Sequence, residues 1–344
     1  MSIEKYDKIF TIGLVSLSLP TYDISDEDIN NEKDEKSKEK KEKQKRLNMR
    51  VRAGIDYLTA NGFVITLGKT VFPKKSFSYK AASIQDRVDD VHEMFSNPQI
   101  NLVMNTIGGY NCNEILEYLD YDLIEKNPKY FVGFSDITSA NLALFTKSRI
   151  KTVNGSHITY YLHDKNSFLD LFQTLNNEKE ELIPEKFIWE GDLSKTLREP
   201  GKIKFLQNKK STAQGWAIGG NLSTFCLMLG TEYMPDFSGS VLFIEYDKEE
   251  QTCLPSLERL MWQIRQNGIF KKINALVFGQ LQKDVAKEET ETDNLERILK
   301  DVTDGYDFPV LFNTTFGHIY PSWQIINGAT IQLSTADPIK IKLK

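Results

Sequence analysis

One serine follows a short apolar run, at a position where an α/β protein can carry a nucleophile. Ser135 comes directly after residues 130–134 (YFVGF), and a helix is expected to begin within residues 136–139 (DITS). Open α/β domains place their functional groups at the carboxyl ends of strands, and amides at a helix start can stabilise an oxyanion. The sequence GFSDI is similar to the G-x-S-x-G nucleophile elbow, with Ile137 in place of the second glycine. The alternative is that Ser135 or Asp136 only caps the helix.

Two adjacent glycines, Gly108 and Gly109, follow a second apolar run, residues 100–104 (INLVM). Glycine permits a sharp turn at a strand end and leaves amide N–H groups accessible, which suits a negatively charged oxygen. The sequence TIGGYN matches neither G-x-G-x-x-G nor a P-loop. A plain tight turn explains the two glycines equally well.

A carboxylate and two histidines are candidates for proton transfer. Glu245 closes the apolar run 240–244, where a carboxylate needs either a partner or solvent. An imidazole is a suitable partner, because the carboxylate fixes its tautomer and stabilises its cation. His318 follows Gly317 in a loop marked by glycine and proline, and His157 competes for the same role. The residue types do not choose between the two histidines, and a solvent-facing glutamate is the alternative for Glu245.

The histidines and cysteines do not have the spacing of a metal site. The four histidines form no H-E-x-x-H pattern, and Cys112, Cys226 and Cys253 form no C-x-x-C pattern. Three cysteines also make no disulfide framework. Carboxylates that bind Mg²⁺ leave no readable spacing, so that kind of site stays open. We therefore expect neither a zinc site nor a cofactor.

Length and charge restrict the class of protein. The 344 residues exceed the usual size of a single core and predict two domains. With 43 Lys and Arg against 48 Asp and Glu, the net charge of -5 argues against non-specific binding of nucleic acid. The N-terminus lacks a signal-peptide pattern, and no apolar run is long enough to span a bilayer. The sequence therefore predicts a cytoplasmic protein without a membrane partner.

Strand-like and helical patterns alternate in the first half of the chain. Residues 9–15 and 63–67 are strand-like, as are the two runs described above, and Ser83 is expected to cap an amphipathic helix over residues 84–95. This alternation predicts a Rossmann-like α/β domain with a mostly parallel sheet over residues 1–163. Residues 32–46, with eight basic and five acidic side chains, are typical of a solvated loop or exposed helix.

The second half changes in character twice. Residues 164–209 are charged, contain two prolines and have weak periodicity, which predicts an interdomain segment. Residues 210–344 contain the strand-like runs 240–244 and 273–279 and end in an alternating tail. We predict a smaller, mixed α/β domain there.

Five motifs, taken together and in this order, resemble the LD-carboxypeptidase family of serine peptidases, and within it the microcin C immunity peptidases. The similarity runs from the first strand to the last, and residues 106–122 are most like the immunity branch. The motifs are Gly108–Asn111, Gly133–Thr138, Gly219–Leu222, Ile244–Glu245 and Phe316–His318.

The resemblance implies a Ser-Glu-His triad, here Ser135, Glu245 and His318, in which the histidine takes the serine proton and the glutamate orients the histidine. It implies an oxyanion hole formed by the amides of Gly109 and Asp136. It also implies a serine-bearing Rossmann-like domain, a smaller C-terminal domain bearing the other two triad members, a homodimer, and no metal. Cys112 stands where relatives more often have serine, and a small buried thiol is expected there.

The resemblance leaves the substrate open between two classes. The immunity branch cleaves the bond between a peptide or amino acid and a nucleotide, whereas the other branch removes D-alanine from murein tetrapeptide. Trp189 either stacks on a nucleobase or covers an apolar patch. Lys248 either meets a phosphate or carboxylate or faces solvent, and Asn221 is a third candidate for substrate binding. The expected function is a serine peptidase acting on a modified peptide or aminoacyl-nucleotide. A non-catalytic small-ligand-binding protein is the alternative from another class.

Overall fold

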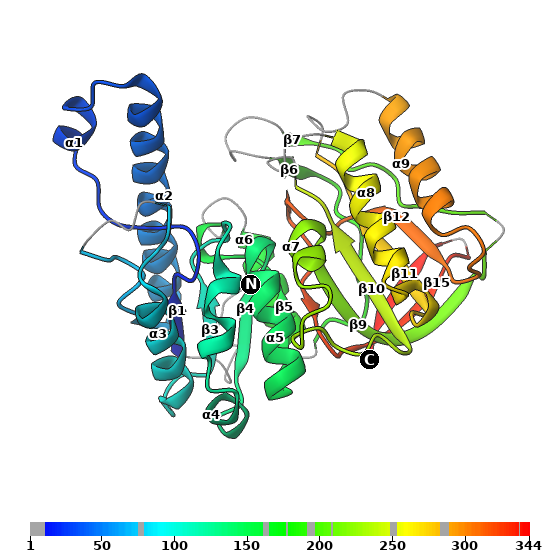
Figure 1. Cartoon of the computed structure of the whole chain (residues 1–344), viewed down its shortest axis with the longest axis horizontal. Coiled ribbons are helices and arrows are strands. Elements are labelled where there is room, and N and C mark those ends of the chain that lie inside the picture. The colour runs from blue at the N-terminus through cyan, green and yellow to red at the C-terminus, as the bar shows by residue number, and fades with distance from the viewer. Residues whose placement is uncertain are drawn as a thin grey trace. The chain divides into compact units, whose positions relative to one another are not determined.

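The computed structural model describes residues 11–74, 79–160, 165–176, 178–190, 197–207, 209–247, 253–282, 289–336 and 338–344. The chain divides into two compact units of nearly equal length, Met1–Phe168 and Leu169–Lys344 (Figure 1). Each unit has its own sheet, and each combines that sheet with helices. The predicted class, a Rossmann-like N-terminal α/β domain followed by a mixed α/β domain, is therefore confirmed.

The described part of the first unit contains five strands, and helices alternate with them. In chain order the elements are β1 (Thr11–Val15), α1 (Asp26–Asn30), α2 (Glu35–Ala60), β2 (Val64–Leu67), α3 (Ile84–Ser96), β3 (Leu102–Asn105), a 3₁₀ helix (Cys112–Tyr118), α4 (Tyr121–Lys126), β4 (Tyr130–Gly133), a 3₁₀ turn (Ser135–Ile137), α5 (Thr138–Ser148), β5 (Thr152–Asn154) and a 3₁₀ turn (Ile158–Tyr160).

These five strands are all parallel and lie in the order β2-β1-β3-β4-β5. The chain moves outward from β1 to β2 and then returns to the other side of β1 to form β3. In doubly wound sheets, ligands bind outside the carboxyl ends of the strands where the order reverses in this way. The loops that follow β1 and β3 therefore lie at the expected position of a site.

The burial pattern explains why these segments form strands and helices. Strands β3 and β4 are buried along almost their whole length, as expected for parallel strands covered on both faces. In α3 the Oγ of Ser83 accepts a hydrogen bond from the amide of Asp86 at 3.1 Å, so the predicted N-cap is confirmed. The side chains of Val88, Val91 and Met94, three residues apart, form its buried face.

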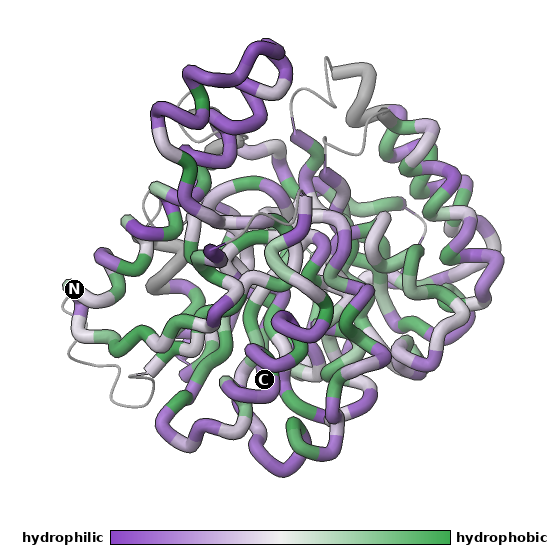
Figure 2. The backbone as a smooth tube through the Cα atoms, turned by 60° about the vertical axis from the view of Figure 1, so that its left-hand side comes forward, coloured by the Kyte–Doolittle hydropathy of each residue, from purple (hydrophilic) through white to green (hydrophobic). Residues whose placement is uncertain are grey.

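The charged segment forms the first half of α2. All five buried residues of this helix lie from Leu47 onward, so residues 35–46 contribute no buried side chain. Figures 1 and 2 show this end of α2 as a hydrophilic extension beside α1. Ion pairs stabilise the extension, since Lys41 contacts Glu32 at 2.8 Å and Lys45 contacts Asp26 at 2.6 Å. Of the two predicted alternatives for residues 32–46, the exposed helix is correct over the helical part.

The second unit contains the remaining elements. In chain order they are α6 (Lys165–Leu175), which crosses the boundary between the units, β6 (Ile188–Glu190), β7 (Leu197–Arg198), β8 (Lys204–Phe205), β9 (Thr212–Asn221), α7 (Leu222–Leu227), β10 (Ser240–Glu245), α8 (Cys253–Gln266), a 3₁₀ turn (Ile269–Lys271), β11 (Ala275–Gly279), α9 (Glu289–Val302), β12 (Val310–Thr314), β13 (Ile319–Tyr320), β14 (Ile325–Ile326), β15 (Thr330–Ser334) and β16 (Lys340–Leu343).

A seven-stranded mixed sheet organises this unit, in the order β16-β15-β9-β10-β11-β12-β8. The four strands β9 to β12 are parallel, and antiparallel strands close both edges. Helices α7, α8 and α9 lie side by side along the sheet in Figure 1. A cluster of buried side chains that includes Phe243, Phe316 and Trp323 contains no residue of these helices and forms a second core.

Residues 164–209, expected to connect the domains, contain several regular elements. The segment includes α6, and its strand β8 pairs with β12 in the main sheet of the second unit. Strands β6 and β7 form a separate three-stranded antiparallel sheet with β13. Strands of two or three residues are too short to produce the alternation on which sequence-based prediction depends. Among the helices of the described residues, none combines the length and apolar composition needed to cross a bilayer.

Helix α2 packs closely against the turn at Ile158 through Gly54. A Cβ atom at Gly54 would lie 2.6 Å from the carbonyl oxygen of Ile158 and 2.8 Å from its Cγ1. Gly54→Ala should therefore lower the free energy of unfolding by about 1–3 kcal/mol through overpacking, although alanine favours helices by about 1 kcal/mol. Urea denaturation measures the difference. Ala60→Ser, at the exposed end of the same helix, is the control; an equal midpoint for Gly54→Ala and wild type would contradict the prediction.

Candidate active site

Ser135 occupies a strained turn between β4 and α5. Its φ of 61° lies in the left-handed region, which non-glycine residues rarely adopt. Neither the 3₁₀ turn that begins at Ser135 nor α5 has a hydrogen bond from a capping side chain. The capping alternative for Ser135 and Asp136 is therefore wrong, and the geometry is that of an elbow presenting a side chain at the end of a strand.

The two glycines after β3 pack directly against this turn. A Cβ atom on Gly108 would lie 2.9 Å from the Cβ of Ser135, 3.2 Å from its Oγ and 3.4 Å from the amide nitrogen of Asp136. Gly109 has a φ of 150°, and a Cβ atom there would collide with the Oγ of Ser18. Both positions thus require glycine because other groups approach closely. A tight turn in isolation does not explain this arrangement.

His157 has a structural contact that engages the nitrogen a base would need. Its Nε2 accepts a hydrogen bond from the backbone amide of Phe134 at 3.1 Å, and its ring stacks on the Phe134 ring at a centroid distance of 4.4 Å. The imidazole is fully buried. The structure therefore favours an anchoring role for His157, at the residue that precedes Ser135.

In the second unit, Glu245 and His318 form a buried pair. The Nδ1 of His318 lies 2.7 Å from the Oε2 of Glu245, and the glutamate is only 1% exposed. A Cβ atom at Gly317 would lie 2.8 Å from the Cβ of Glu245, so glycine lets the histidine loop approach the end of β10. The side chain of Gln282 donates a hydrogen bond to the carbonyl oxygen of His318 at 2.8 Å and holds the loop from another side.

A second carboxylate, Asp247, lies near the same imidazole. Its Oδ2 is 3.4 Å from the Nε2 of His318, so carboxylates face both ring nitrogens. This arrangement stabilises the imidazolium that forms when a histidine takes a proton. Asp247 is not among the residues predicted from the sequence. The available signal was its spacing of two residues from Glu245, which directs two side chains to the same side of an extended chain.

The three candidates for substrate binding differ in what the structure describes. Asn221 pairs with Glu245 in the register of β9 and β10, and its side-chain oxygen caps α7 by accepting a hydrogen bond from the amide of Thr224 at 3.0 Å. The backbone of Trp189 lies in β6 opposite Tyr320. Lys248 lies outside the described residues.

Cys112 is a structural thiol, as expected. It is fully buried, and burial raises the pKa of its thiol to about 12. A thiol with such a pKa is almost entirely protonated near neutral pH and is a poor nucleophile. Among the described residues, no group of three or more His, Cys, Asp or Glu side chains could hold a metal ion.

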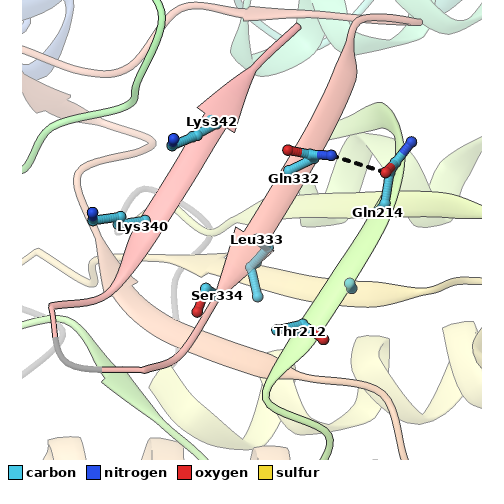
Figure 3. Close-up of a pocket in the computed structure, with 8 residues that line it drawn as sticks. Thr212, Gln214, Gln332, Leu333, Ser334, Lys340 and Lys342 are labelled. Carbon is cyan, nitrogen blue, oxygen red and sulfur yellow. Dashed lines mark hydrogen bonds between the residues drawn. The ribbon is translucent and has the colours of Figure 1, made fainter.

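A groove on the outer part of the second sheet is a different kind of surface. It has a volume of about 540 Å³, and its walls come from β9, β15 and β16 (Figure 3). The Nε2 of Gln332 donates a hydrogen bond to the Oε1 of Gln214 at 3.0 Å. None of the candidate residues above belongs to its lining. The residues that line the groove are Thr212, Ala213, Gln214, Gln332, Leu333, Ser334, Lys340 and Lys342.

Two family models match the chain. The model of the LD-carboxypeptidase N-terminal domain matches residues 39–155, and that of the LD-carboxypeptidase C-terminal domain matches residues 214–333. The chain belongs to the LD-carboxypeptidase family. Ser135 lies in the first match, and Glu245 and His318 lie in the second. Membership identifies the protein as a serine-type carboxypeptidase, a hydrolase, which favours the enzyme over the non-catalytic ligand-binding alternative.

The named relatives of this LD-carboxypeptidase family member include an immunity protein and a murein peptide carboxypeptidase. The microcin C7 self-immunity protein MccF of Escherichia coli is 29% identical over 298 residues, covering 81% of this chain and 84% of MccF. The probable murein peptide carboxypeptidase of Bacillus subtilis is 29% identical over 289 residues, covering 82% of this chain and 83% of that protein. Among solved structures, an MccF-like protein from Bacillus anthracis str. Ames has a TM-score of 0.83 and 27% identity, covering 98% and 97% of the two chains. The family resemblance predicted from the motifs is confirmed.

The anchoring role of His157 can be separated from a role as base. In His157→Gln the side-chain carbonyl can still accept the hydrogen bond from the amide of Phe134, so kcat should stay within about tenfold of wild type. In His157→Leu the buried amide loses its partner, which should cost about 1–3 kcal/mol of unfolding free energy and lower kcat about 100-fold by displacing Ser135. Steady-state kinetics and thermal unfolding measure both effects. If His157 were the base, both variants would lose activity by several powers of ten.

Proposed function

We propose that this chain is a peptidase of the microcin C immunity type, which hydrolyses the amide bond joining a peptide or amino acid to a nucleotide-like group. Ser135, Glu245 and His318 form its catalytic triad in this proposal. The observation that carries it is the buried hydrogen bond between Glu245 and the Nδ1 of His318, in a family whose N-terminal match contains a serine at a strained strand end. Because Glu245 holds Nδ1, the nitrogen that exchanges a proton is Nε2, which lies 3.4 Å from the Oδ2 of Asp247.

The proposed reaction proceeds through an acyl-enzyme. The Oγ of Ser135 attacks the scissile carbonyl carbon while the Nε2 of His318 takes its proton. The C–N bond then breaks, and His318 gives the proton to the departing nitrogen. Water next attacks the ester on Ser135 with His318 again as base, which releases the acid and restores the serine. Glu245 holds the imidazole in place throughout.

The amides of Gly109 and Asp136 are the proposed oxyanion hole. Gly108 lies against both Ser135 and the amide of Asp136, which supports this assignment because donors and nucleophile must share one small space. Removing one donor of an oxyanion hole typically costs about 100- to 1,000-fold in kcat. We therefore expect the loop that contains Gly109 to contribute to turnover about as much as a residue that supports the triad.

The choice of substrate depends on the relatives. MccF is named for self-immunity to microcin C7, and solved structures of MccF contain aspartyl sulfamoyl adenosine and glutamyl sulfamoyl guanosine. The probable murein peptide carboxypeptidase has the same sequence identity to this chain as MccF, 29%. Trimming of murein tetrapeptide is therefore the second candidate. The sequence of residues 106–122, most like the immunity branch, favours the aminoacyl-nucleotide.

Three further residues complete the proposed substrate site. Trp189 would stack on the nucleobase, which typically contributes about 1–3 kcal/mol. Lys248 would meet a phosphate or carboxylate, and Asn221 would contact the substrate beside Glu245, its neighbour in the register of the sheet. The cytoplasmic location expected from the sequence and the homodimer implied by the family resemblance stay predictions.

Substitution of the proposed nucleophile is the direct test of the triad. Ser135→Ala should reduce kcat by several powers of ten with normal thermal unfolding, because the residues of a triad act as a unit. A serine-directed fluorophosphonate should label the wild-type protein once, and labelling should disappear in Ser135→Ala and His318→Ala. Ser96→Ala, an exposed serine at the end of α3, is the matched control and should keep both labelling and activity. Normal turnover by a folded Ser135→Ala protein would end the triad assignment.

A side-by-side assay with purified protein separates the two substrate classes. We expect glutamyl sulfamoyl adenosine to be cleaved to glutamate and sulfamoyl adenosine, and murein tetrapeptide to be left intact. Liquid chromatography with mass detection of both products measures the outcome, with Ser135→Ala as the background. Release of D-alanine from the tetrapeptide alone would assign the chain to the murein branch.

A further inference from the structure

A buried carboxylate lies immediately after the proposed nucleophile, and the mechanism above uses only its backbone. The side chain of Asp136 is 4% exposed. Its Oδ2 accepts hydrogen bonds from the Oγ of Ser18 at 2.6 Å, the amide of Asn111 at 2.8 Å and the amide of Cys112 at 2.8 Å. A single oxygen thus connects three segments of the first unit: the loop after β1, the glycine loop after β3 and the nucleophile turn after β4.

Ser18 extends this connection to the glycines themselves. While its hydroxyl donates to Asp136, its Oγ accepts a hydrogen bond from the amide of Tyr110 at 2.9 Å. The amide of Leu19 donates to the carbonyl oxygen of Gly108 at 3.1 Å. The backbone on both sides of Gly109 is therefore bonded to the loop that follows β1, and Gly109 itself packs on the Ser18 hydroxyl.

Arg87 holds the far side of the same loop. Its guanidinium is fully buried, and its Nη1 donates to the carbonyl oxygen of Leu17 at 3.0 Å and to both the carbonyl and side-chain oxygens of Asn111 at 2.9 Å. Its Nη2 donates to the Oε2 of Glu114 at 2.6 Å. A planar guanidinium with several fixed donors is suited to lock loops that meet at an angle.

This arrangement is costly for folding alone. Burial raises the pKa of Asp136, while the hydrogen bonds from Ser18, Cys112 and Asn111 and the charge of Arg87 oppose the shift. Well-packed apolar residues commonly replace buried charges with no loss of stability. A buried charge network directly behind the proposed nucleophile therefore points to a demand for position.

We propose that the carboxylate of Asp136 is a positioning residue, which with Ser18 and Arg87 holds residues 108–112 so that the amides of Gly109 and Asp136 converge on the oxyanion. The inference depends on the proposed function, because it assigns a role to the same serine site. The carboxylate does not touch the substrate. It acts on the reaction by fixing donors that must be aligned before charge develops.

The test is Asp136→Asn in the full-length protein, with the substrate that the wild type cleaves. Asparagine keeps the shape but removes the negative charge that two amides and a hydroxyl share. We expect kcat to fall about 10- to 100-fold with KM within about threefold, since the ground state does not use the oxyanion hole. The inhibition constant of a boronic acid, which forms a tetrahedral adduct with serine, should weaken by a similar factor.

Asp90 provides a matched control in the same unit. It is a fully buried carboxylate that accepts hydrogen bonds from two backbone amides, those of Lys69 at 3.0 Å and Thr70 at 2.8 Å. Asp90→Asn should lower the free energy of unfolding about as much as Asp136→Asn does. It should leave kcat within about twofold of the wild-type value. Ser18→Ala, which removes one contact of the Asp136 oxygen, should lower kcat about 3- to 10-fold and serves if Asp136→Asn does not fold.

Each result has a defined reading. The positioning role would be overturned by a wild-type kcat in folded Asp136→Asn, by an equal loss of kcat in Asp90→Asn, or by an effect of Asp136→Asn confined to KM. For Ser18→Ala, an unchanged kcat together with unchanged boronic acid affinity would do the same. Failure of the triad assignment is distinguishable, because there Ser135→Ala would keep its activity whatever the Asp136 variants do.

Discussion

The first unit is organised around the left-handed backbone of Ser135, which a side-chain-bearing residue adopts only under constraint. Such a conformation costs about 1–2 kcal/mol. Contacts on both sides of the serine compensate for this cost. Before it, His157 accepts a hydrogen bond from the amide of Phe134; after it, the Asp136 carboxylate accepts hydrogen bonds from the glycine loop. A strand order that reverses beside β1 brings those loops together. The conformation of one residue thus depends on segments that span most of the unit.

The second unit uses the same principle with different groups. Parallel strands again end where chemistry is expected, here at Glu245 on β10, and a glycine loop again lets another segment approach closely. A fully buried glutamate would be unfavourable alone, and its bond to His318 makes its burial tolerable. In both units a polar group is stable at its position only because a second segment satisfies it.

The sequence predicted the features that depend on local pattern. Apolar runs identified the central strands, and the serine before α3 identified a helix start. What it could not show is geometry that depends on distant segments. His157 and His318 both follow glycine-containing loops, and contacts with distant residues distinguish them: His157 accepts a hydrogen bond from the amide of Phe134, whereas His318 pairs with Glu245. Ser18 and Arg87 come near the glycine loop only in the folded chain. The residues next to them in the sequence form no motif that would have predicted this. The short strands of residues 164–209 escaped detection for the same reason, because pairing with remote partners defines them.

The first half of α2 can vary among members of this family without disturbing their cores. Because residues 35–46 bury no side chain, their identity and number are decoupled from the packing that supports Ser135. The family match begins at residue 39, within that stretch. Insertions and deletions can therefore accumulate there at little energetic penalty, so that lineages of otherwise similar enzymes would be told apart by this helical extension sooner than by their catalytic cores.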